Sequence, residues 1–141
     1  MSAALRAAAA LVVASGVALA PALAAPAPIV GRWVTVEGKA IVEVAPCGPA
    51  LCGRIARVLE LRPGGPAFDA NNPDPTKRRQ PIEGLTILTG FVAAGDHWRG
   101  RIYDPESGRT YRSELRVDGG TLKVKGCYGP FCRTQEWARA R

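Results

Sequence analysis

Short strand-like runs alternate with turn sequences along this chain, and that alternation limits the possible folds more than any other feature. The runs are rich in β-branched, aromatic and aliphatic residues, and they are separated by clusters of Gly, Pro, Asp and Asn. The predicted strands are residues 31–36, 39–45, 51–61, 85–92, 97–103, 109–117, 121–126 and 131–139. Eight short strands with such spacing are typical of an all-β domain. The 16 Gly and 12 Pro among 141 residues also disfavour a helical bundle.

Alternation of side-chain character within the runs indicates strands with one buried face. Leu122 and Val124, for example, alternate with Thr121, Lys123 and Lys125. One face of such a strand lies in water and the other in the core, as in antiparallel sheets. Consecutive antiparallel strands joined by hairpins close most simply into an up-and-down β-barrel, so we predict a small barrel of about eight strands. A small β-sandwich is the structural alternative.

Four cysteines form two pairs with the same spacing, Cys47 with Cys52 and Cys127 with Cys132. Each pair brackets four residues that include Gly-Pro, and a four-residue hairpin loop places its flanking residues opposite each other, within disulfide range. We therefore predict the disulfides Cys47–Cys52 and Cys127–Cys132. A long-range pairing would remove more chain entropy, and sequence alone does not choose strictly among the three pairings. A four-thiolate zinc site is the competing hypothesis, with a spacing at the edge of that in zinc knuckles.

The first 24 residues differ in composition from the rest and predict a secretory signal peptide. One positive charge, Arg6, precedes an apolar stretch over residues 7–20, and Ala22-Leu23-Ala24 provides a small-residue cleavage site. The stretch is too short and too rich in alanine for a membrane anchor. We expect cleavage to leave one domain of residues 25–141, without a transmembrane segment, in the periplasm or outside the cell. Disulfides fit that oxidising location.

Basic residues outnumber acidic ones by 19 to 12, which gives a formal net charge of +7. Apart from Lys77-Arg78-Arg79, the cations are spread singly over the strands and are not gathered with stacking aromatic residues. The pattern therefore predicts no nucleic-acid partner. A solvated surface accounts for these charges. The functional alternative is attraction to anionic envelope material such as lipid headgroups, which would weaken as salt increases.

A long irregular stretch, residues 62–84, interrupts the strands and contains five prolines. Loops of this length in compact domains are often functional, although an Ω-loop pinned by Asx and Pro turns would explain it structurally. Its candidate functional residues are Asp69, Asn71, Asn72 and Asp74. They match a calcium loop poorly, because Pro73 and Asp74 occupy the fifth and sixth positions and the twelfth is not Glu. We therefore predict no metal site.

Residues suited to acid–base or nucleophilic chemistry are scattered, so we predict a non-enzymatic protein without a cofactor. His97, the one histidine, begins a strand at a position where an exposed side chain is expected. No spacing brings two carboxylates together, and the sequence contains no nucleophile-elbow, zinc-protease or nucleotide-binding motif. A hydrolase that uses carboxylates of the long loop remains the alternative.

Tryptophans stand near both ends of the expected domain, with Trp33 in the first strand and Trp137 in the last. The first and last strands of an up-and-down barrel are neighbours, so Trp33 should be able to stack against an arginine near the C-terminus. We expect Trp33, Trp137 and Arg139 to close the barrel.

A set of short motifs runs through nearly all of residues 25–141. In chain order they are Gly31-x-Trp33, Cys52-Gly53-x-Ile55, Asp69-x-Asn71-Asn72-Pro73-Asp74, Gly84-Leu85, Trp98-x-Gly100-x-Ile102-Tyr103-Asp104-Pro105-x-x-Gly108-x-x-Tyr111, Leu122-x-Val124-x-Gly126 and Trp137-x-Arg139. Together they resemble domain-of-unknown-function family 2147, a family of small exported bacterial proteins. Its members are thought to adopt a calycin-like, lipocalin-type barrel. The resemblance implies this fold and export, and it implies no particular reaction or catalytic residue.

These observations make an exported binding protein the first functional hypothesis. An eight-stranded barrel can just hold side chains or one small ligand, and we expect an apolar or amphipathic molecule such as a fatty acid or lipid fragment. The residues expected to line the interior are Trp33, Leu85, Ile87, Phe91, Trp98, Ile102, Tyr111 and Leu115. The alternative is an envelope-associated protein-interaction module with a side-chain-filled barrel. A cavity of about 300 Å³ or more with an apolar lining would favour ligand binding.

Overall fold

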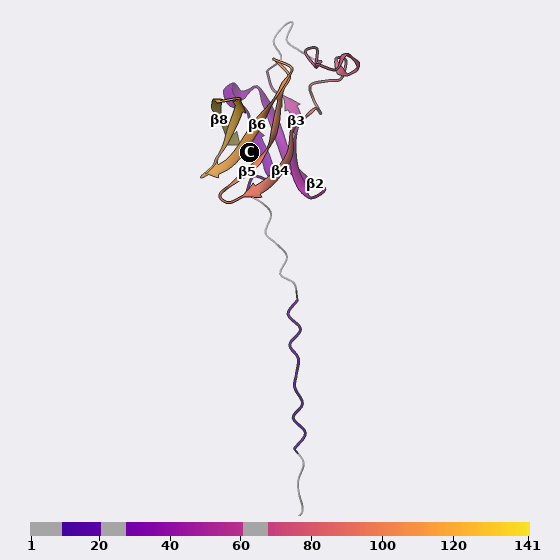
Figure 1. Ribbon diagram of the computed structural model, residues 1–141, viewed down its shortest axis with the longest axis vertical. Helices are drawn as coiled ribbons and strands as arrows, with labels where there is room; N and C mark the ends of the chain where they lie inside the picture. The colour runs from indigo at the N-terminus through magenta and orange to yellow at the C-terminus, as the bar shows by residue number, and fades with distance from the viewer. Residues whose placement is uncertain (1–9, 21–27, 61–67) are drawn as a thin grey trace, which may run out of the picture.

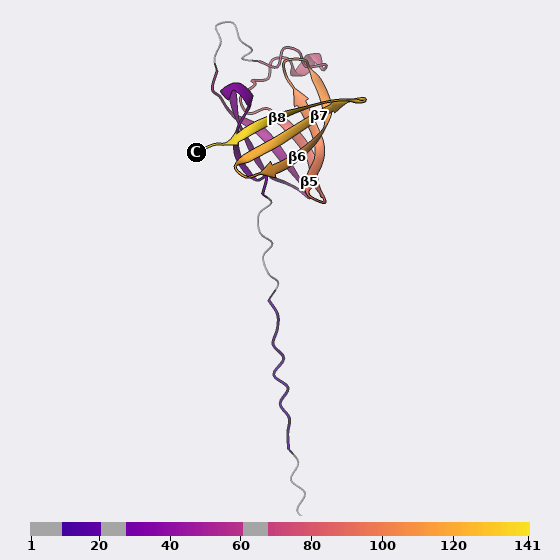
Figure 2. The same cartoon turned by 90° about the vertical axis from the view of Figure 1, so that its left-hand side faces the viewer.

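A closed antiparallel barrel forms the body of the computed structural model, which describes residues 10–20, 28–60 and 68–141 (Figures 1 and 2). Each strand pairs with the next along the chain, and the eighth pairs with the first, so the predicted up-and-down topology is confirmed. The strands are β1 (Gly31–Val34), β2 (Ala40–Cys47), β3 (Ala50–Val58), β4 (Thr86–Ala94), β5 (His97–Asp104), β6 (Arg109–Asp118), β7 (Thr121–Tyr128) and β8 (Phe131–Arg139).

Two of the predicted strands are shorter than expected. The first ends at Val34, because a short 3-10 helix, η1 (Val36–Gly38), makes the connection to β2. Glu37 adopts a positive φ of 60° in this tight turn. The third strand ends at Val58 instead of residue 61. A second 3-10 helix, η2 (Pro75–Lys77), lies in the long connection between β3 and β4.

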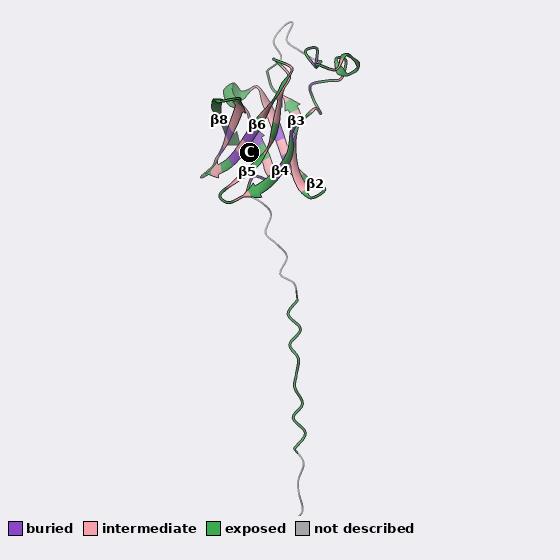
Figure 3. Cartoon of the chain, viewed as in Figure 1, coloured by how far each residue is buried: buried purple, intermediate pink, exposed green. Residues whose placement is uncertain are grey.

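The alternating apolar and polar residues of the strands lie on the inner and outer faces of the barrel, respectively. Leu115 on β6 stands opposite Val124 on β7, and both side chains are buried, whereas Arg116 and Lys123 form a neighbouring pair on the outer face. Most of the buried residues lie on the strands of the barrel (Figure 3). Burying each large aliphatic or aromatic side chain contributes about 1.5–3 kcal/mol, so the inward set supplies most of the stability.

The predicted contact between Trp33 and a C-terminal arginine is present where the barrel closes. Trp33 on β1 pairs in register with Arg139 on β8, and the guanidinium carbon lies 3.9 Å from the centroid of the Trp33 ring. Arg139 also donates hydrogen bonds to the carbonyls of Val30 (3.0 Å) and Pro28 (3.2 Å). Gly31 makes room for this arrangement, because a Cβ there would collide with Nη1 of Arg139 and its φ is 136°.

Both predicted disulfides are present, but the hairpins that carry them have two-residue turns instead of four-residue loops. Cys127 and Cys132 stand directly opposite each other, with Gly129 and Pro130 in the turn beyond them. In the other hairpin, Cys47 stands opposite Ala50, so the bond to Cys52 runs diagonally across the strand pair. The Cα–Cα distances of 4.1 and 5.8 Å suit these two positions.

The up-and-down topology gives the barrel two different ends. We call the end where β1–β2, β3–β4, β5–β6 and β7–β8 connect the mouth end, and the other the closed end. Ile29 has no exposed surface, and its carbonyl accepts a hydrogen bond of 2.9 Å from Nε1 of Trp33 near the start of β1. The segment before β1 therefore covers the closed end with a buried side chain.

The N-terminal stretch that the structure describes, residues 10–20, forms neither helix nor strand, and its large apolar side chains are exposed. The rest of the predicted signal peptide, and residues 62–67 of the predicted 62–84 loop, lie outside the described residues. None of the described helices has the length and apolar character needed to cross a bilayer.

Candidate functional site

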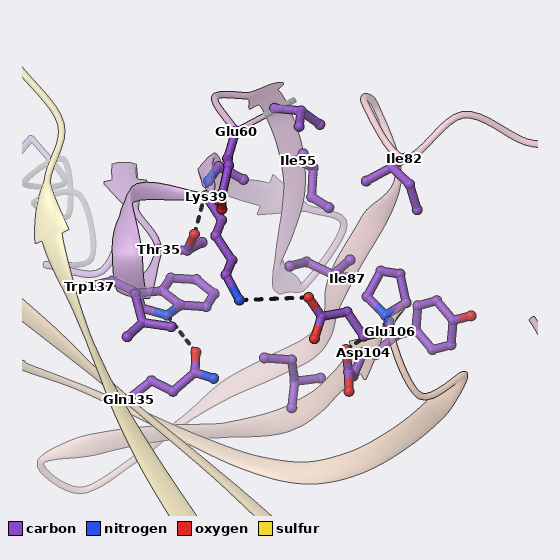
Figure 4. A pocket seen from close by; sticks show the side chains of 16 residues that line it. Thr35, Lys39, Ile55, Glu60, Ile82, Ile87, Asp104, Glu106, Gln135 and Trp137 are labelled. Carbon is purple, nitrogen blue, oxygen red and sulfur yellow. Dashed lines mark hydrogen bonds and ion pairs between the residues drawn. The ribbon is translucent and has the colours of Figure 1, made fainter. Parts of the chain in front are cut away.

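A cavity of about 330 Å³ opens at the mouth end of the barrel (Figure 4). Its walls come from the ends of β2, β3, β4 and β5, from η1, and from the β5–β6 turn, and β8 contributes to its floor. The lining residues are Thr35, Val36, Lys39, Ala40, Ile55, Val58, Glu60, Ile82, Ile87, Ile102, Tyr103, Asp104, Pro105, Glu106, Gln135 and Trp137. The volume is at the lower end of the range for small-molecule pockets.

The inner part of this cavity is apolar. Ile55, Ile87 and Ile102 line it from three neighbouring strands, β3, β4 and β5. Trp137 on β8 lies across from Ile87 (Figure 4). Nε1 of Trp137 donates a hydrogen bond of 3.0 Å to Oε1 of Gln135, so the indole presents its apolar ring to the cavity with its polar atom satisfied. This surface suits a hydrocarbon group.

The rim of the cavity is charged. Lys39 extends across the opening toward Glu106 (Figure 4), with 3.8 Å between Nζ and Oε1, and it lies 3.0 Å from Glu37. Asp104 and Glu60 also line the cavity. Among the described residues, the lining combines one ammonium group with three carboxylates, so the described part of the entrance carries a net negative charge.

A buried carboxylate, Asp69, anchors the long β3–β4 connection to the barrel. Its side chain has no exposed surface and accepts hydrogen bonds from Tyr103 Oη (2.7 Å), Asn72 Nδ2 (2.7 Å) and Gln80 Nε2 (3.3 Å). A buried carboxylate is costly unless its oxygens are satisfied, so these three donors are what permit its burial. Burial raises the pKa of the Tyr103 phenol well above its ordinary value, and the hydrogen bond to Asp69 adds to this effect.

The neighbouring residues of the loop continue the same network. Oδ1 of Asn72 accepts a hydrogen bond of 2.9 Å from the Asp74 amide, and Asp74 caps η2 by accepting from the Thr76 amide and hydroxyl. The hydrogen bonds from Thr76 lower the pKa of Asp74 below its ordinary value. These contacts are the Asx turns expected of a self-pinned Ω-loop.

Asn71 ties the loop to the rim of the cavity. Its Nδ2 donates to the carbonyl of Glu106 at 2.8 Å, in the β5–β6 turn. Gly108 allows this close approach, because a Cβ there would collide with the carbonyl oxygen of Asn71. The loop therefore holds the β5–β6 turn, which contains the rim carboxylate Glu106 and follows directly after another, Asp104.

Comparisons with known proteins agree with this architecture. The family described as "Uncharacterized protein conserved in bacteria (DUF2147)" matches residues 31–139. The chain belongs to this family. Its fold is similar to that of protein HP1028 from the human pathogen Helicobacter pylori, which belongs to the lipocalin family. The TM-score is 0.69 at 20% sequence identity, over 82% of this chain and 85% of that one. No curated protein sequence matches significantly.

The structure of this DUF2147 member places the eight predicted lining residues in different surroundings. Ile87 and Ile102 line the cavity. Trp33, Phe91 and Leu115 are fully buried in the core, and Leu85 and Trp98 are partly buried and pack against it. Tyr111 lies in an edge-to-face contact with Tyr128, with 6.1 Å between ring centroids. Ile87 and Ile102 thus lie where the binding hypothesis needs them, and contact of the eight residues with a ligand stays a prediction.

Several cavity residues were not anticipated from the sequence. Ile55 and Val58 lie on β3, where a β-bulge in the pairing with β2 shifts the register, so simple alternation does not group them. Gln135 stands two residues before Trp137 on β8, so both side chains lie on the inward face. This spacing could have identified Gln135 as a cavity residue from the sequence. Lys39, Glu60 and Glu106 lie in connections, whose side chains no periodic pattern predicts.

The structure does not bring His97 together with the carboxylates of the cavity. His97 lies at the closed end as the first residue of β5, where Nδ1 is 2.8 Å from Asp96 and Nε2 accepts a hydrogen bond from Arg99. The hydrogen bond from His97 lowers the pKa of Asp96. Asp104 is engaged by the Glu106 amide and the Ser107 hydroxyl. Among the described residues, no cluster of His, Cys, Asp and Glu suits a metal ion.

Proposed function

We propose that this protein is an exported, non-enzymatic binding protein that holds a small apolar or amphipathic molecule in the mouth-end cavity. The observation that carries the proposal is a cavity of about 330 Å³ with an inner wall of Ile55, Ile87, Ile102 and Trp137. A lipocalin-like barrel is typical of such binding proteins. The two disulfides are compatible with a location outside the cytoplasm.

The charges at the entrance define which end groups the site should accept. Three carboxylates and one ammonium group line the cavity, and the ammonium is already close to Glu37 and Glu106. A ligand carboxylate at the entrance would meet net like charge, which disfavours its binding. We therefore favour an amphiphile with a neutral or cationic head over a fatty acid.

The alternative of a side-chain-filled barrel fits only the closed half. Phe91, Leu115 and Leu122 fill that half, with at most 1% of each side chain exposed. The mouth half contains the cavity. The packed half supplies the stability of the fold, and the mouth half is left for a ligand.

The fluorescent probe N-phenyl-1-naphthylamine, which is neutral and apolar, tests the proposal in titrations against the full chain. Ile87→Trp places a larger side chain in the cavity and should weaken probe binding by about tenfold or more, since about 1.4 kcal/mol corresponds to tenfold. Val92→Trp is the matched control, because Val92 lies on the same strand with 52% of its surface exposed. Equal binding by both variants, with native circular dichroism, would place the probe outside the cavity.

A further inference from the structure

The β7–β8 hairpin ends in two exposed aromatic side chains. Tyr128 and Phe131 flank the turn of Gly129 and Pro130, and they are 62% and 79% exposed. We call residues 128–131 the aromatic tip. The hairpin extends past the wall of the barrel, so the tip projects from the surface (Figure 2). Exposing aromatic rings on a projecting turn contributes nothing to the core.

Arginines surround the aromatic tip. The guanidinium of Arg109 lies 5.7 Å from the centroid of the Tyr128 ring, and Arg112 donates a hydrogen bond of 2.9 Å to the carbonyl of Gly129. Arg133 follows the tip on β8 and is exposed. Residues 125–135 contain no Asp or Glu. On the outer wall nearer the closed end, by contrast, Arg116 and Lys123 lie beside carboxylates, those of Asp96 and Asp118.

The tip lies at the same end of the barrel as the cavity entrance, because the β7–β8 turn belongs to the mouth end. Three further large apolar side chains are exposed in connections at this end: Val36, Leu59 and Phe68. In the part of the barrel that the structure describes, Val92 is the one such side chain near the closed end. Exposed apolar surface is thus concentrated around the opening.

The shape of the tip favours a membrane over a protein partner. A stable protein interface buries about 800 Å² on each side, which needs a broad patch. Two aromatic rings on a narrow turn, with guanidinium groups set back along the strands, fit the interfacial layer of a bilayer. There the rings reach the apolar boundary while the arginines meet phosphate oxygens. The Cys127–Cys132 disulfide lies just behind the turn, so little ordering is needed on binding.

We propose that the aromatic tip docks the mouth end of the barrel on an anionic membrane surface. Tyr128 and Phe131 enter the interface, and Arg109, Arg112 and Arg133 contact lipid phosphates. This surface is separate from the cavity lining, so the two proposals can fail independently.

Co-sedimentation of the full chain with phosphatidylcholine vesicles, with and without phosphatidylglycerol, tests this proposal at low and high salt. The wild type should bind the anionic vesicles, and salt should weaken this binding. Tyr128→Ser/Phe131→Ser should lower the partition coefficient about tenfold or more, and Arg109→Gln/Arg112→Gln should lower binding to anionic vesicles specifically. Val92→Ser and Arg116→Gln are the matched controls near the closed end and should bind as the wild type does.

Three results would overturn the proposal. The first is that the wild type does not bind anionic vesicles. The second is that the tip variants bind as well as the controls while keeping native circular dichroism. The third is that the tip variants abolish self-association in sedimentation equilibrium without changing vesicle binding, which would make a second copy of the chain the occupant. Titration of each variant with N-phenyl-1-naphthylamine reports separately on the cavity.

Discussion

The phenol of Tyr103 donates a hydrogen bond of 2.7 Å to Asp69, a carboxylate with no exposed surface, and thereby joins strand β5 to a loop 34 residues away in the chain. The same loop holds the β5–β6 turn through Asn71, and that turn carries rim residues of the cavity. The loop is therefore part of the frame of the candidate site. Its conformation should affect both stability and ligand binding.

Replacing Asp69 by Asn should release the loop. The amide nitrogen would face the donors of Asn72 or Gln80, which leaves buried donors unsatisfied and costs about 1–3 kcal/mol. Urea unfolding measures this loss. Trypsin provides a second readout, because Lys77, Arg78 and Arg79 are exposed on the loop and should be cleaved faster in the variant. Asp118→Asn, at the exposed end of β6, is the control; it removes a charge from an exposed ion pair with Lys123, so both measurements should change little.

Alkaline pH should destabilise the protein through Tyr103. Its phenol has a raised pKa in the folded state, so the folded chain retains a proton that the unfolded chain loses near pH 10. The unfolded state then binds fewer protons, and stability falls as the pH rises above 10. Tyr103→Phe should be less stable at neutral pH but lose stability less steeply above pH 10. An identical alkaline slope in Tyr103→Phe and in Tyr128→Phe, whose ring is exposed, would contradict this account.

Arg139→Lys should weaken the closure of the barrel. Lysine keeps the charge but loses the planar group that stacks on Trp33 and reaches two carbonyls. The expected loss is about 1–3 kcal/mol in the free energy of unfolding. Arg116→Lys, whose arginine is half exposed beside Asp96, should cost much less. Equal losses in the two variants would show that Arg139 acts only as a surface charge.

Each disulfide should make a small and separate contribution. A ring of six residues removes little chain entropy, about 2 kcal/mol per bond. Cys47→Ala/Cys52→Ala and Cys127→Ala/Cys132→Ala should therefore destabilise by similar amounts, and the losses should add because the bonds lie at opposite ends of the barrel. A thiol count of the denatured, unreduced wild type provides the direct check. Four free thiols would refute both pairings.

Local patterns were enough to predict the barrel. The alternation within strands such as β7, the turn residues between strands and the six-residue disulfide rings each involve residues that are close together in the sequence. The hairpin loops were predicted too long because pairing continues past the cysteines, as between Tyr128 and Phe131. The contact of Trp33 with Arg139 followed from topology once the barrel was assumed.

The position of the cavity could not be predicted from these local patterns. Which half of a barrel is filled depends on how side chains from non-adjacent strands meet, as Ile87 on β4 and Trp137 on β8 do. The role of Asp69 likewise depends on Tyr103 and Gln80, which approach it only in the folded chain. From the sequence, Asp69, Asn71, Asn72 and Asp74 were candidate functional residues of the long loop. In the structure their side chains make the hydrogen bonds that anchor this loop.

Native mass spectrometry of the protein, purified gently from the cells that produce it, tests the central claim of a ligand-binding cavity most directly. The wild type should retain a bound small molecule, and the same preparation of Ile87→Trp, with a filled cavity, should have lost it. Val92→Trp should retain the molecule as the wild type does. A bare mass for the wild type, or the same adduct on the wild type and Ile87→Trp, would contradict the account.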